Sequence, residues 1–314
     1  MKGVYCDGAG ITFRDDLPEP KAGPGETVLR VRAVGICDTD LQLARGYMGF
    51  HGILGHEFVG EADDGRRVTA EINAACRQCP TCRAGLFQHC PHRTVLGILN
   101  HDGAMAERVR VPIANLHDVP DAISDREAVF IEPLAAALRI AEQVALGPGV
   151  RKAIVGDGKL GLLCAWAARL TGADVSLVGK HPEKLELAGE KIATHTLEAA
   201  RHLERDFDVV ADCTGSPSGL PTALGLVRPC GTLVLKTTVA GTYTIDLSPI
   251  VIDEVRVVGS RCGPFAPAID ALARRAIDVR PLIGAELRLD EAEAAFRAAA
   301  AKGARKILMR NETP

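Results

Sequence analysis

Four cysteines stand close together in the first third of the chain, at spacings that suit a metal ion. They are Cys76, Cys79, Cys82 and Cys90, and they fall within fifteen residues. Zn²⁺ in structural sites prefers a closed tetrahedron of thiolates, and such spacing is typical of zinc sites. Chance clustering and an iron–sulfur site are the alternatives. We predict a structural zinc lobe over residues 76–90.

Other polar residues of this lobe have different roles. His89 and His92 flank Cys90, but four sulfurs already fill a tetrahedron, so we interpret both histidines as solvated loop residues. Arg77 and Arg83 lie between the cysteines and moderate the negative charge of four thiolates.

A second set of ligand types lies outside the lobe. Cys37 is followed nineteen residues later by His56 and Glu57. Each fragment alone fits a packed cysteine or a surface turn, but together they resemble an open zinc site with three protein ligands. Glu132 lies in an apolar stretch, where a buried carboxylate is costly unless it is paired or bound to a metal. Alternatively, Glu132 caps a helix that begins at Pro133.

A glycine-rich turn follows a short apolar run. Gly156, Gly158 and Gly161 lie between a predicted strand, Lys152–Val155, and a predicted helix, Leu162–Leu170. In this context the three glycines serve a tight turn, close approach to a pyrophosphate, and helix–strand packing. The amino terminus of the helix favours the anion. The sequence therefore predicts a dinucleotide site.

The residue expected to bind the adenosine ribose is not acidic. The next predicted strand ends in Gly179, Lys180 and His181, where NAD-dependent enzymes carry an Asp or Glu. A glycine beside two basic side chains leaves room and charge for a 2′-phosphate, which favours NADP(H) over NAD(H). Alternatively, Lys180 simply projects into solvent. Further cofactor contacts are expected from Lys159, Leu160 and Thr214.

The element pattern that must position these residues changes along the chain. A length of 314 residues suggests two domains. The first third is β-rich, and a helix is expected over Leu134–Ala145. The early strands are expected at Thr27–Val34, Phe58–Ala62 and Ala106–Val111.

Strands then alternate with helices, which indicates βαβ units and a parallel sheet. After Lys152–Val155 the strands are expected at Asp174–Val178, Asp208–Asp212, Gly231–Leu235 and Glu254–Gly259. Further helices are expected at Pro182–Lys191 and Leu220–Val227. The tail has a predicted helix, Glu291–Ala301, and a closing strand, Lys306–Met309. The fold class is therefore α/β with a β-rich domain beside a parallel-sheet domain.

Composition excludes several function classes. Lys and Arg total 37 against 40 Asp and Glu, for a formal charge of −3, which gives no footprint for nucleic acid. No run approaches the roughly 20 apolar residues of a membrane helix. The first residues lack the apolar run of a secretion signal. We expect a cytoplasmic protein whose partner is a small molecule.

In order along the chain, these motifs resemble those of the zinc-dependent medium-chain dehydrogenase/reductase family, which includes alcohol, sorbitol and threonine dehydrogenases. The resemblance implies a GroES-like catalytic domain over residues 1–133 with a return over 263–314, and a Rossmann domain over 134–262. It also implies two zinc ions per chain, NAD(P), and a homodimer or homotetramer.

The resemblance also assigns roles to individual residues. Cys37, His56 and Glu132 match the catalytic-zinc ligands of the sorbitol-dehydrogenase-like branch, and Glu57 matches a carboxylate that can transiently bind the metal or support it. Thr39 matches the hydroxyl that passes the substrate proton outward. Arg305 matches an arginine on the pyrophosphate.

One departure concerns the proton route. The alcohol-dehydrogenase branch has a histidine five residues after the catalytic cysteine, whereas this chain has Gln42, which cannot titrate. The proton must therefore leave through water, a ribose hydroxyl or another residue.

The predicted reaction is hydride transfer between NAD(P) and an alcohol or carbonyl substrate. Two alternatives remain: reduction of a C=C bond conjugated to a carbonyl, enoyl thioesters included, and a non-catalytic nucleotide-binding role. The complete set of catalytic-zinc ligands argues against both. The sequence does not identify the substrate.

Overall fold

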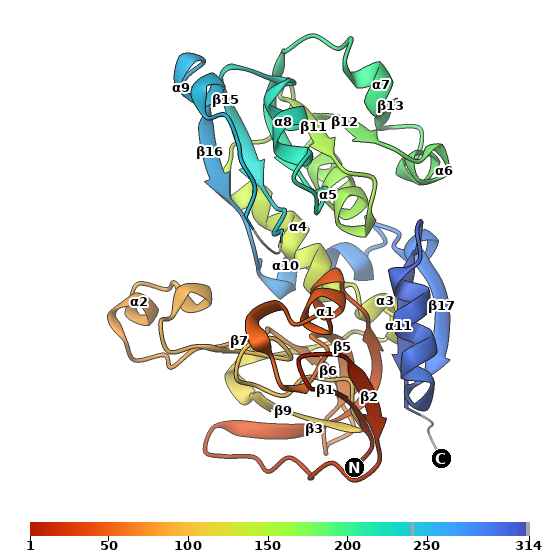
Figure 1. Cartoon of the computed structure of the whole chain (residues 1–314). Helices are drawn as coiled ribbons and strands as arrows, with labels where there is room; N and C mark the ends of the chain where they lie inside the picture. The colour runs from red at the N-terminus through yellow and green to blue at the C-terminus, as the bar shows by residue number, and fades with distance from the viewer. Residues whose placement is uncertain (240–241, 312–314) are drawn as a thin grey trace. The chain divides into compact units, whose positions relative to one another are not determined.

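The computed structural model describes residues 1–239 and 242–311 (Figure 1). The chain divides into two compact units. The first unit comprises Met1–Glu132 with Ala268–Pro314, and the second comprises Pro133–Pro267. The domain boundaries predicted from the sequence lie at residues 133/134 and 262/263. Among the described residues, no helix is long and apolar enough to span a bilayer.

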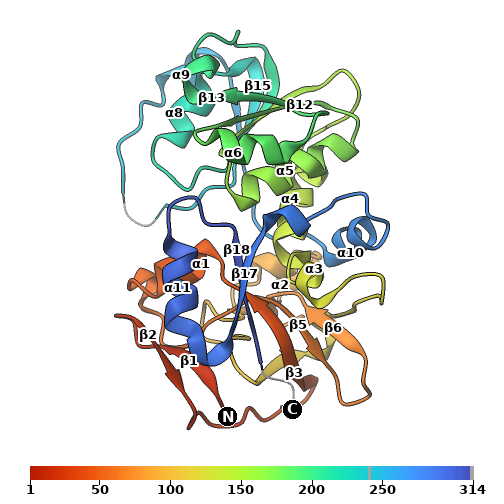
Figure 2. The same ribbon diagram turned by 90° about the vertical axis from the view of Figure 1, so that its right-hand side faces the viewer.

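The first unit is built on a sheet of seven strands around β3 (Glu26–Gly35). Strand β3 pairs antiparallel with β5 (Glu57–Glu61), β9 (Arg108–Pro112) and β18 (Lys306–Arg310). Figure 2 shows β3, β5 and β6 side by side. The other strands of this sheet are β6 (Arg67–Ala70), β10 (Leu116–Asp118) and β17 (Ile283–Arg288). The tail thus returns to the strand that leads to Cys37.

Shorter elements complete the first unit. The strands are β1 (Gly3–Cys6), β2 (Ile11–Arg14), β4 (Gly52–Ile53), β7 (Asn73–Ala74) and β8 (Thr94–Val95). The helices are α1 (Asp38–Leu43), α2 (Pro80–Arg83), α3 (Asp125–Ala128) and α11 (Ala292–Ala300). Helices α4 (Ile131–Gln143) and α10 (Phe265–Ala273) run across the two boundaries between the units.

The second unit is a six-stranded sheet in which all strand pairs are parallel. Its order is β13-β12-β11-β14-β15-β16. Strand β11 (Arg151–Val155) is almost wholly buried because it lies in the middle of the sheet. The other strands are β12 (Asp174–Gly179), β13 (Ala193–Thr196), β14 (Phe207–Asp212), β15 (Val227–Leu235) and β16 (Arg256–Gly259). This order reverses beside β11, which is where α/β sheets bind nucleotides.

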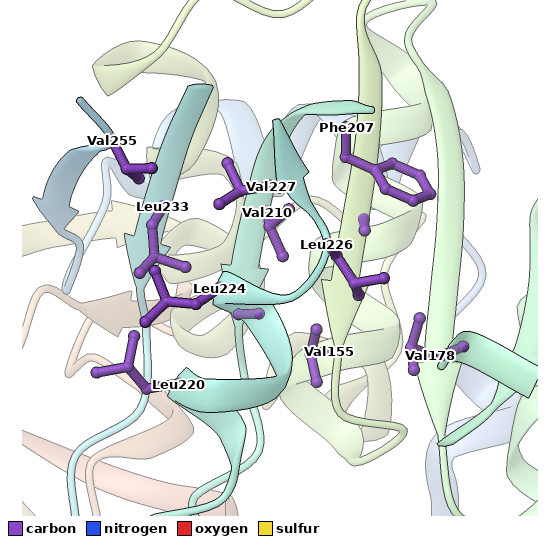
Figure 3. Packing of buried hydrophobic residues seen from close by; sticks show 13 residues of the cluster. Val155, Val178, Phe207, Val210, Leu220, Leu224, Leu226, Val227, Leu233 and Val255 are labelled. Atoms are coloured by element: carbon purple, nitrogen blue, oxygen red, sulfur yellow. The ribbon is translucent and has the colours of Figure 1, made fainter. Parts of the chain in front are cut away.

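Helices connect the strands of this sheet and bury its core. They are α5 (Lys159–Leu170), α6 (Pro182–Leu185), α7 (Leu197–Ala200), α8 (Gly219–Leu224) and α9 (Ser248–Ile252). Figure 3 shows Leu220 and Leu224 of α8 in one apolar cluster with Val210 and Leu233 of the strands. The predicted alternation of strands and helices is therefore confirmed.

Two predicted helices are shorter than expected. Instead of one helix over 182–191, α6 ends at Leu185, and a 3₁₀ turn over Glu186–Ala188 leads to Gly189. Gly189 has φ of 80°, which ends helical geometry. The helix predicted over 220–227 ends at Leu224, because Val227 already belongs to β15.

Candidate functional site

The four cysteines of the predicted lobe lie together in the structure. The Sγ atoms of Cys76 and Cys82 are 4.0 Å apart, those of Cys79 and Cys90 are 3.9 Å apart, and those of Cys76 and Cys90 are 3.5 Å apart. Zn–S bonds of about 2.3 Å in a tetrahedron place the sulfurs about 3.8 Å apart. The four thiols therefore fit a zinc ion, whereas His89 and His92 are exposed and lie outside this group.

Local backbone geometry presents these sulfurs. Pro80 begins α2, and Cys79 at its amino terminus accepts a hydrogen bond from the Cys82 N–H at 3.4 Å. Gly85 has φ of 77°, which turns the chain back toward Cys90. Backbone N–H groups of the loop lower the pKa of Cys76 to about 6. Thiolate is the form that binds zinc.

A second group joins Cys37, His56 and Glu57, whose ligand atoms lie within 4.8 Å of one another. Cys37 immediately precedes α1, and Glu57 is the first residue of β5. The sheet brings them together because Gly35 of β3 pairs with Glu57. His56 and Glu57 are buried, and Cys37 is half-buried. Sulfur, imidazole and carboxylate form a ligand set that suits zinc.

Asp40, which is not among the residues predicted from the sequence, lies behind this group. The fully buried carboxylate of Asp40 accepts hydrogen bonds from the N–H groups of Cys37 (2.8 Å) and Gly55 (3.3 Å). His56 Nδ1 lies 3.4 Å from Asp40 Oδ1. Burial opposes protonation of His56, but the Asp40 carboxylate raises the His56 pKa well above its usual value. A carboxylate behind a histidine fixes the ring and leaves its other nitrogen for a metal.

Lys306 forms a buried ion pair with Glu57, a contact that is likewise not among those predicted from the sequence. Both side chains are at most 3% exposed, and Lys306 Nζ also donates to the Ile36 carbonyl at 3.3 Å. Burial would lower the Lys306 pKa, but the Glu57 carboxylate raises it. A Cβ at Gly35 would lie 3.0 Å from Glu57 Oε2 and 3.1 Å from Lys306 Cδ. Gly35 therefore leaves the space that the pair occupies.

The other predicted residues near this group are placed as follows. Thr39 lies in the first turn of α1 and is half-buried. Glu132 is half-buried and lies inside the first turn of α4, which begins at Ile131, so it is not the cap of a helix starting at Pro133. Its carboxylate lies outside the 4.8 Å group. Arg305 is exposed just before β18. The roles of these three residues remain predictions.

The glycine-rich turn of the second unit has the geometry of a phosphate site. Gly156 has φ of 120°, and a Cβ there would lie 2.7 Å from the Cys213 carbonyl oxygen. A Cβ at Gly161 would overlap the Gly156 carbonyl. A Cβ at Gly158 would meet nothing within 4 Å, so the bare backbone at this position faces open space. Since α5 begins at Lys159, the N–H groups of its first turn suit a pyrophosphate.

Residues at the ends of neighbouring strands surround this turn. Lys159 and Leu160 are half-buried at the start of α5. Thr214 follows β14, and its hydroxyl donates to Asp212 Oδ1 at 2.8 Å. Gly179 ends β12, followed by an exposed Lys180 and a half-buried His181. The predicted cofactor residues of the second unit thus lie at the carboxyl ends of neighbouring strands.

Comparison with known proteins agrees with both units. Residues 23–121 match the alcohol dehydrogenase GroES-like domain, and residues 160–275 match the zinc-binding dehydrogenase domain. The chain is similar to sorbitol dehydrogenase of Bacillus subtilis, at 30% identity over 91% of this chain and 89% of that protein. It is also 30% identical to L-threonine 3-dehydrogenase of Streptomyces avermitilis over 94% of both proteins.

A solved structure extends the comparison to three dimensions. A protein from Sinorhizobium meliloti, described as a zinc-binding dehydrogenase bound to NADP, superimposes with a TM-score of 0.88 at 31% identity. The match covers 98% of both chains. The chain therefore belongs to the zinc-binding medium-chain dehydrogenase/reductase family of NAD(P)-dependent alcohol dehydrogenases and reductases.

Proposed function

We propose that the protein is a zinc-dependent oxidoreductase that transfers hydride between NADP(H) and a small alcohol or its carbonyl product, with polyols as the first substrates to test. The observation that carries this proposal is the group of Cys37, His56 and Glu57 with Asp40 behind the histidine. An open site with mixed ligands has no evident structural use.

The residues of the first unit would hold the metal and move the proton. When bound, zinc supplies a Lewis acid for the substrate oxygen, and NADP(H) supplies or accepts the hydride. Cys37, His56 and Glu132 are the proposed ligands, and Glu57, held by Lys306, is a supporting carboxylate. The Thr39 hydroxyl accepts the substrate proton and passes it outward. Because Gln42 cannot titrate, the proton continues through water, a ribose hydroxyl or another residue.

The residues of the second unit would bind the cofactor. The turn leaves space for the pyrophosphate at Gly156, Gly158 and Gly161. The 2′-phosphate is bound by the basic side chains of Lys180 and His181. NADP in the similar Sinorhizobium meliloti structure supports this choice, as does the absence of an acidic residue at position 179. From the family resemblance, Arg305 is proposed as an additional pyrophosphate contact.

The test is a panel of polyols, secondary alcohols and their carbonyl products, each assayed with NAD(H) and NADP(H). Metal analysis of the same preparation counts the zinc ions. We expect turnover with at least one alcohol–carbonyl pair, preference for NADP(H), and two zinc ions per chain. One zinc ion per chain, with reduction of conjugated C=C bonds alone, would reject the proposal.

We also propose that two copies pair through the second unit. Strand β16 is the last strand of the sheet, so one of its edges has no partner strand among the described residues. Nearby, Val251 and Ile252 of α9 are 75% and 77% exposed. Open edges and exposed apolar groups are normally covered, and a two-fold axis lets one edge cover its copy. Val251→Glu should shift the protein from dimer to monomer in light scattering, whereas a wild-type monomer would contradict this.

A further inference from the structure

The residue between the first two glycines of the turn is Asp157, and its side chain does not face solvent. Asp157 is 7% exposed, and its Oδ2 accepts hydrogen bonds from the N–H groups of Lys180 (2.6 Å) and His181 (2.7 Å). The same oxygen lies 3.1 Å from His181 Nδ1. Asp157 therefore ties the glycine-rich turn to the loop that follows β12.

Asp157 also occupies the space beside Gly179. A Cβ added at Gly179 would overlap Asp157 Cβ and lie 2.5 Å from its Oδ2. Gly179 does not have a positive φ, so the backbone does not require glycine here. The glycine is needed for space. A side chain at position 179 and the aspartate at position 157 thus exclude each other.

Position 179 has a defined meaning in this fold. It ends the second strand of the βαβ unit, where NAD-dependent enzymes place the carboxylate that binds the ribose 2′-hydroxyl. In this chain Asp157 brings a carboxylate to that place from the turn. However, two backbone N–H groups already use its Oδ2. This oxygen therefore binds the loop and does not serve as a ligand of the ribose.

The loop presents positive charge next to this carboxylate. Lys180 is exposed, and its ammonium makes no ion pair within residues 1–239 and 242–311. His181 Nδ1 faces Asp157, so the ring is held with Nε2 directed away from the carboxylate. Burial would raise the Asp157 pKa, but the His181 and Lys180 donors lower it, so the carboxylate stays ionised at neutral pH. The backbone N–H groups of Lys180 and His181 stabilise the charge of the Asp157 carboxylate, so the Lys180 ammonium is left for a ligand.

We propose that Asp157 is a specificity-determining positioning residue, which fills the space at position 179 and fixes the loop so that Lys180 and His181 receive the 2′-phosphate of NADP(H). The inference rests on the proposed function for the existence of the nucleotide site. It adds that cofactor choice depends on a residue inside the glycine-rich turn as well as on the strand end.

Binding of two adenosine fragments to the full chain tests this directly. Titration calorimetry with 2′,5′-ADP and with 5′-AMP measures the contribution of the 2′-phosphate without turnover. Asp157→Asn keeps the volume but turns an amide group toward backbone donors. We expect it to weaken 2′,5′-ADP binding by about tenfold and to leave 5′-AMP binding nearly unchanged. Glu183→Gln, an equal charge change on exposed α6, is the matched control and should change neither affinity.

A double-mutant cycle tests the exclusion between the two positions. Gly179→Asp alone should lower the thermal midpoint and weaken both fragments, because its Cβ overlaps Asp157. Asp157→Gly with Gly179→Asp should recover the midpoint and bind 5′-AMP more tightly than 2′,5′-ADP. A Gly179→Asp variant that reverses the preference alone, with unchanged stability, would overturn the proposal.

The two proposals fail in different ways. If Asp157→Asn weakens 5′-AMP as much as 2′,5′-ADP, Asp157 is a ribose ligand and the present inference is wrong. A wild-type chain that binds both fragments equally also contradicts it. If wild type binds neither fragment, the nucleotide site of the proposed function is itself rejected.

Discussion

The two candidate metal sites of the first unit are built in opposite ways. The cysteine lobe takes four identical ligands from one loop of fifteen residues. The group of Cys37, His56 and Glu57 takes three different ligands from two segments joined by the sheet. It also depends on Asp40 and on Lys306, which lies 249 residues from Glu57.

From this difference we expect the lobe to be a site whose metal stabilises the structure, and the other group to be a site whose geometry the rest of the fold maintains. Four thiolates complete the coordination of zinc and leave no open position. In the part of the chain that the structure describes, the mixed group of Cys37, His56 and Glu57 brings three side chains of metal-binding type together, with the buried charges of Asp40 and Lys306 behind them. We therefore expect metal loss to affect stability in the lobe and activity in the mixed group.

Paired serine substitutions give the largest contrast. Cys37→Ser should lower kcat/KM by about a thousandfold or more, because it removes a proposed ligand of the zinc ion that would polarise the substrate. The protein should keep one zinc ion and nearly its full thermal midpoint. Cys90→Ser should instead lower the midpoint of the first unit. Kinetics, metal analysis and calorimetry on the same samples check both.

Equal loss of activity and stability in both variants would remove the distinction between the sites. Unchanged turnover in Cys37→Ser would remove the zinc mechanism altogether. Cys230→Ser, which changes an exposed cysteine of the second unit, is the control and should behave as wild type.

The buried ion pair behind the mixed group should show the next largest effect. Lys306→Met leaves the Glu57 carboxylate buried without its ammonium, and breaking such a pair costs about 3–5 kcal/mol of unfolding free energy. Adding Glu57→Gln should recover most of that loss, because no buried charge then lacks a partner. Arg274→Met, which breaks an exposed pair with Asp270, should cost less than about 1 kcal/mol. Urea unfolding measures all three, and similar losses for Lys306→Met and Arg274→Met would contradict the structure.

Substitution of Asp40 should weaken metal binding by the mixed group and leave metal binding by the lobe unchanged. Asp40→Asn weakens the support of His56, and the loss of such a partner typically lowers metal affinity by about 10–100-fold. Competition with a chelator should therefore release one zinc ion earlier than in wild type, while the second ion leaves at an unchanged chelator concentration. Asp15→Asn, which changes an exposed carboxylate of the same unit, should release both ions as wild type does. Earlier release of both ions in Asp40→Asn would show a general loss of structure.

Local spacing was enough to predict the lobe, because all four ligands lie on one short loop. The motif residues Cys37, His56 and Glu57 were also visible in the sequence. Their support was not, since the Lys306–Glu57 pair exists only because β18 pairs with β3. Asp40 had a local signal that was overlooked: an acidic residue three positions after Cys37, where its side chain can accept the Cys37 N–H.

The same limit applies to the second unit. Alternating strands and helices predicted its sheet, and the glycine spacing predicted the turn. Asp157 stood at an unspecified position of the motif, and its contact with the loop at 180–181 depends on how β11 and β12 align. The helix expected over 182–191 failed because the apolar pattern extends past α6 although the backbone turns at Gly189.

The smallest predicted effect is the pH dependence that the lowered Cys76 pKa gives to the lobe. Backbone donors lower the Cys76 pKa from an ordinary 9.0 to about 6, so between these values the folded lobe binds fewer protons than the unfolded chain. The resulting stabilisation is fully present above pH 9 and is lost as the pH falls through 6. In zinc-stripped protein, iodoacetamide should modify Cys76 with a midpoint near pH 6, whereas a thiol with the ordinary pKa of 9.0 reacts with a midpoint near that value. Mass spectrometry of the peptides gives both midpoints. If they coincide, the loop does not prepare its thiolates before zinc arrives, and the lobe, like the mixed group, depends on structure formed elsewhere.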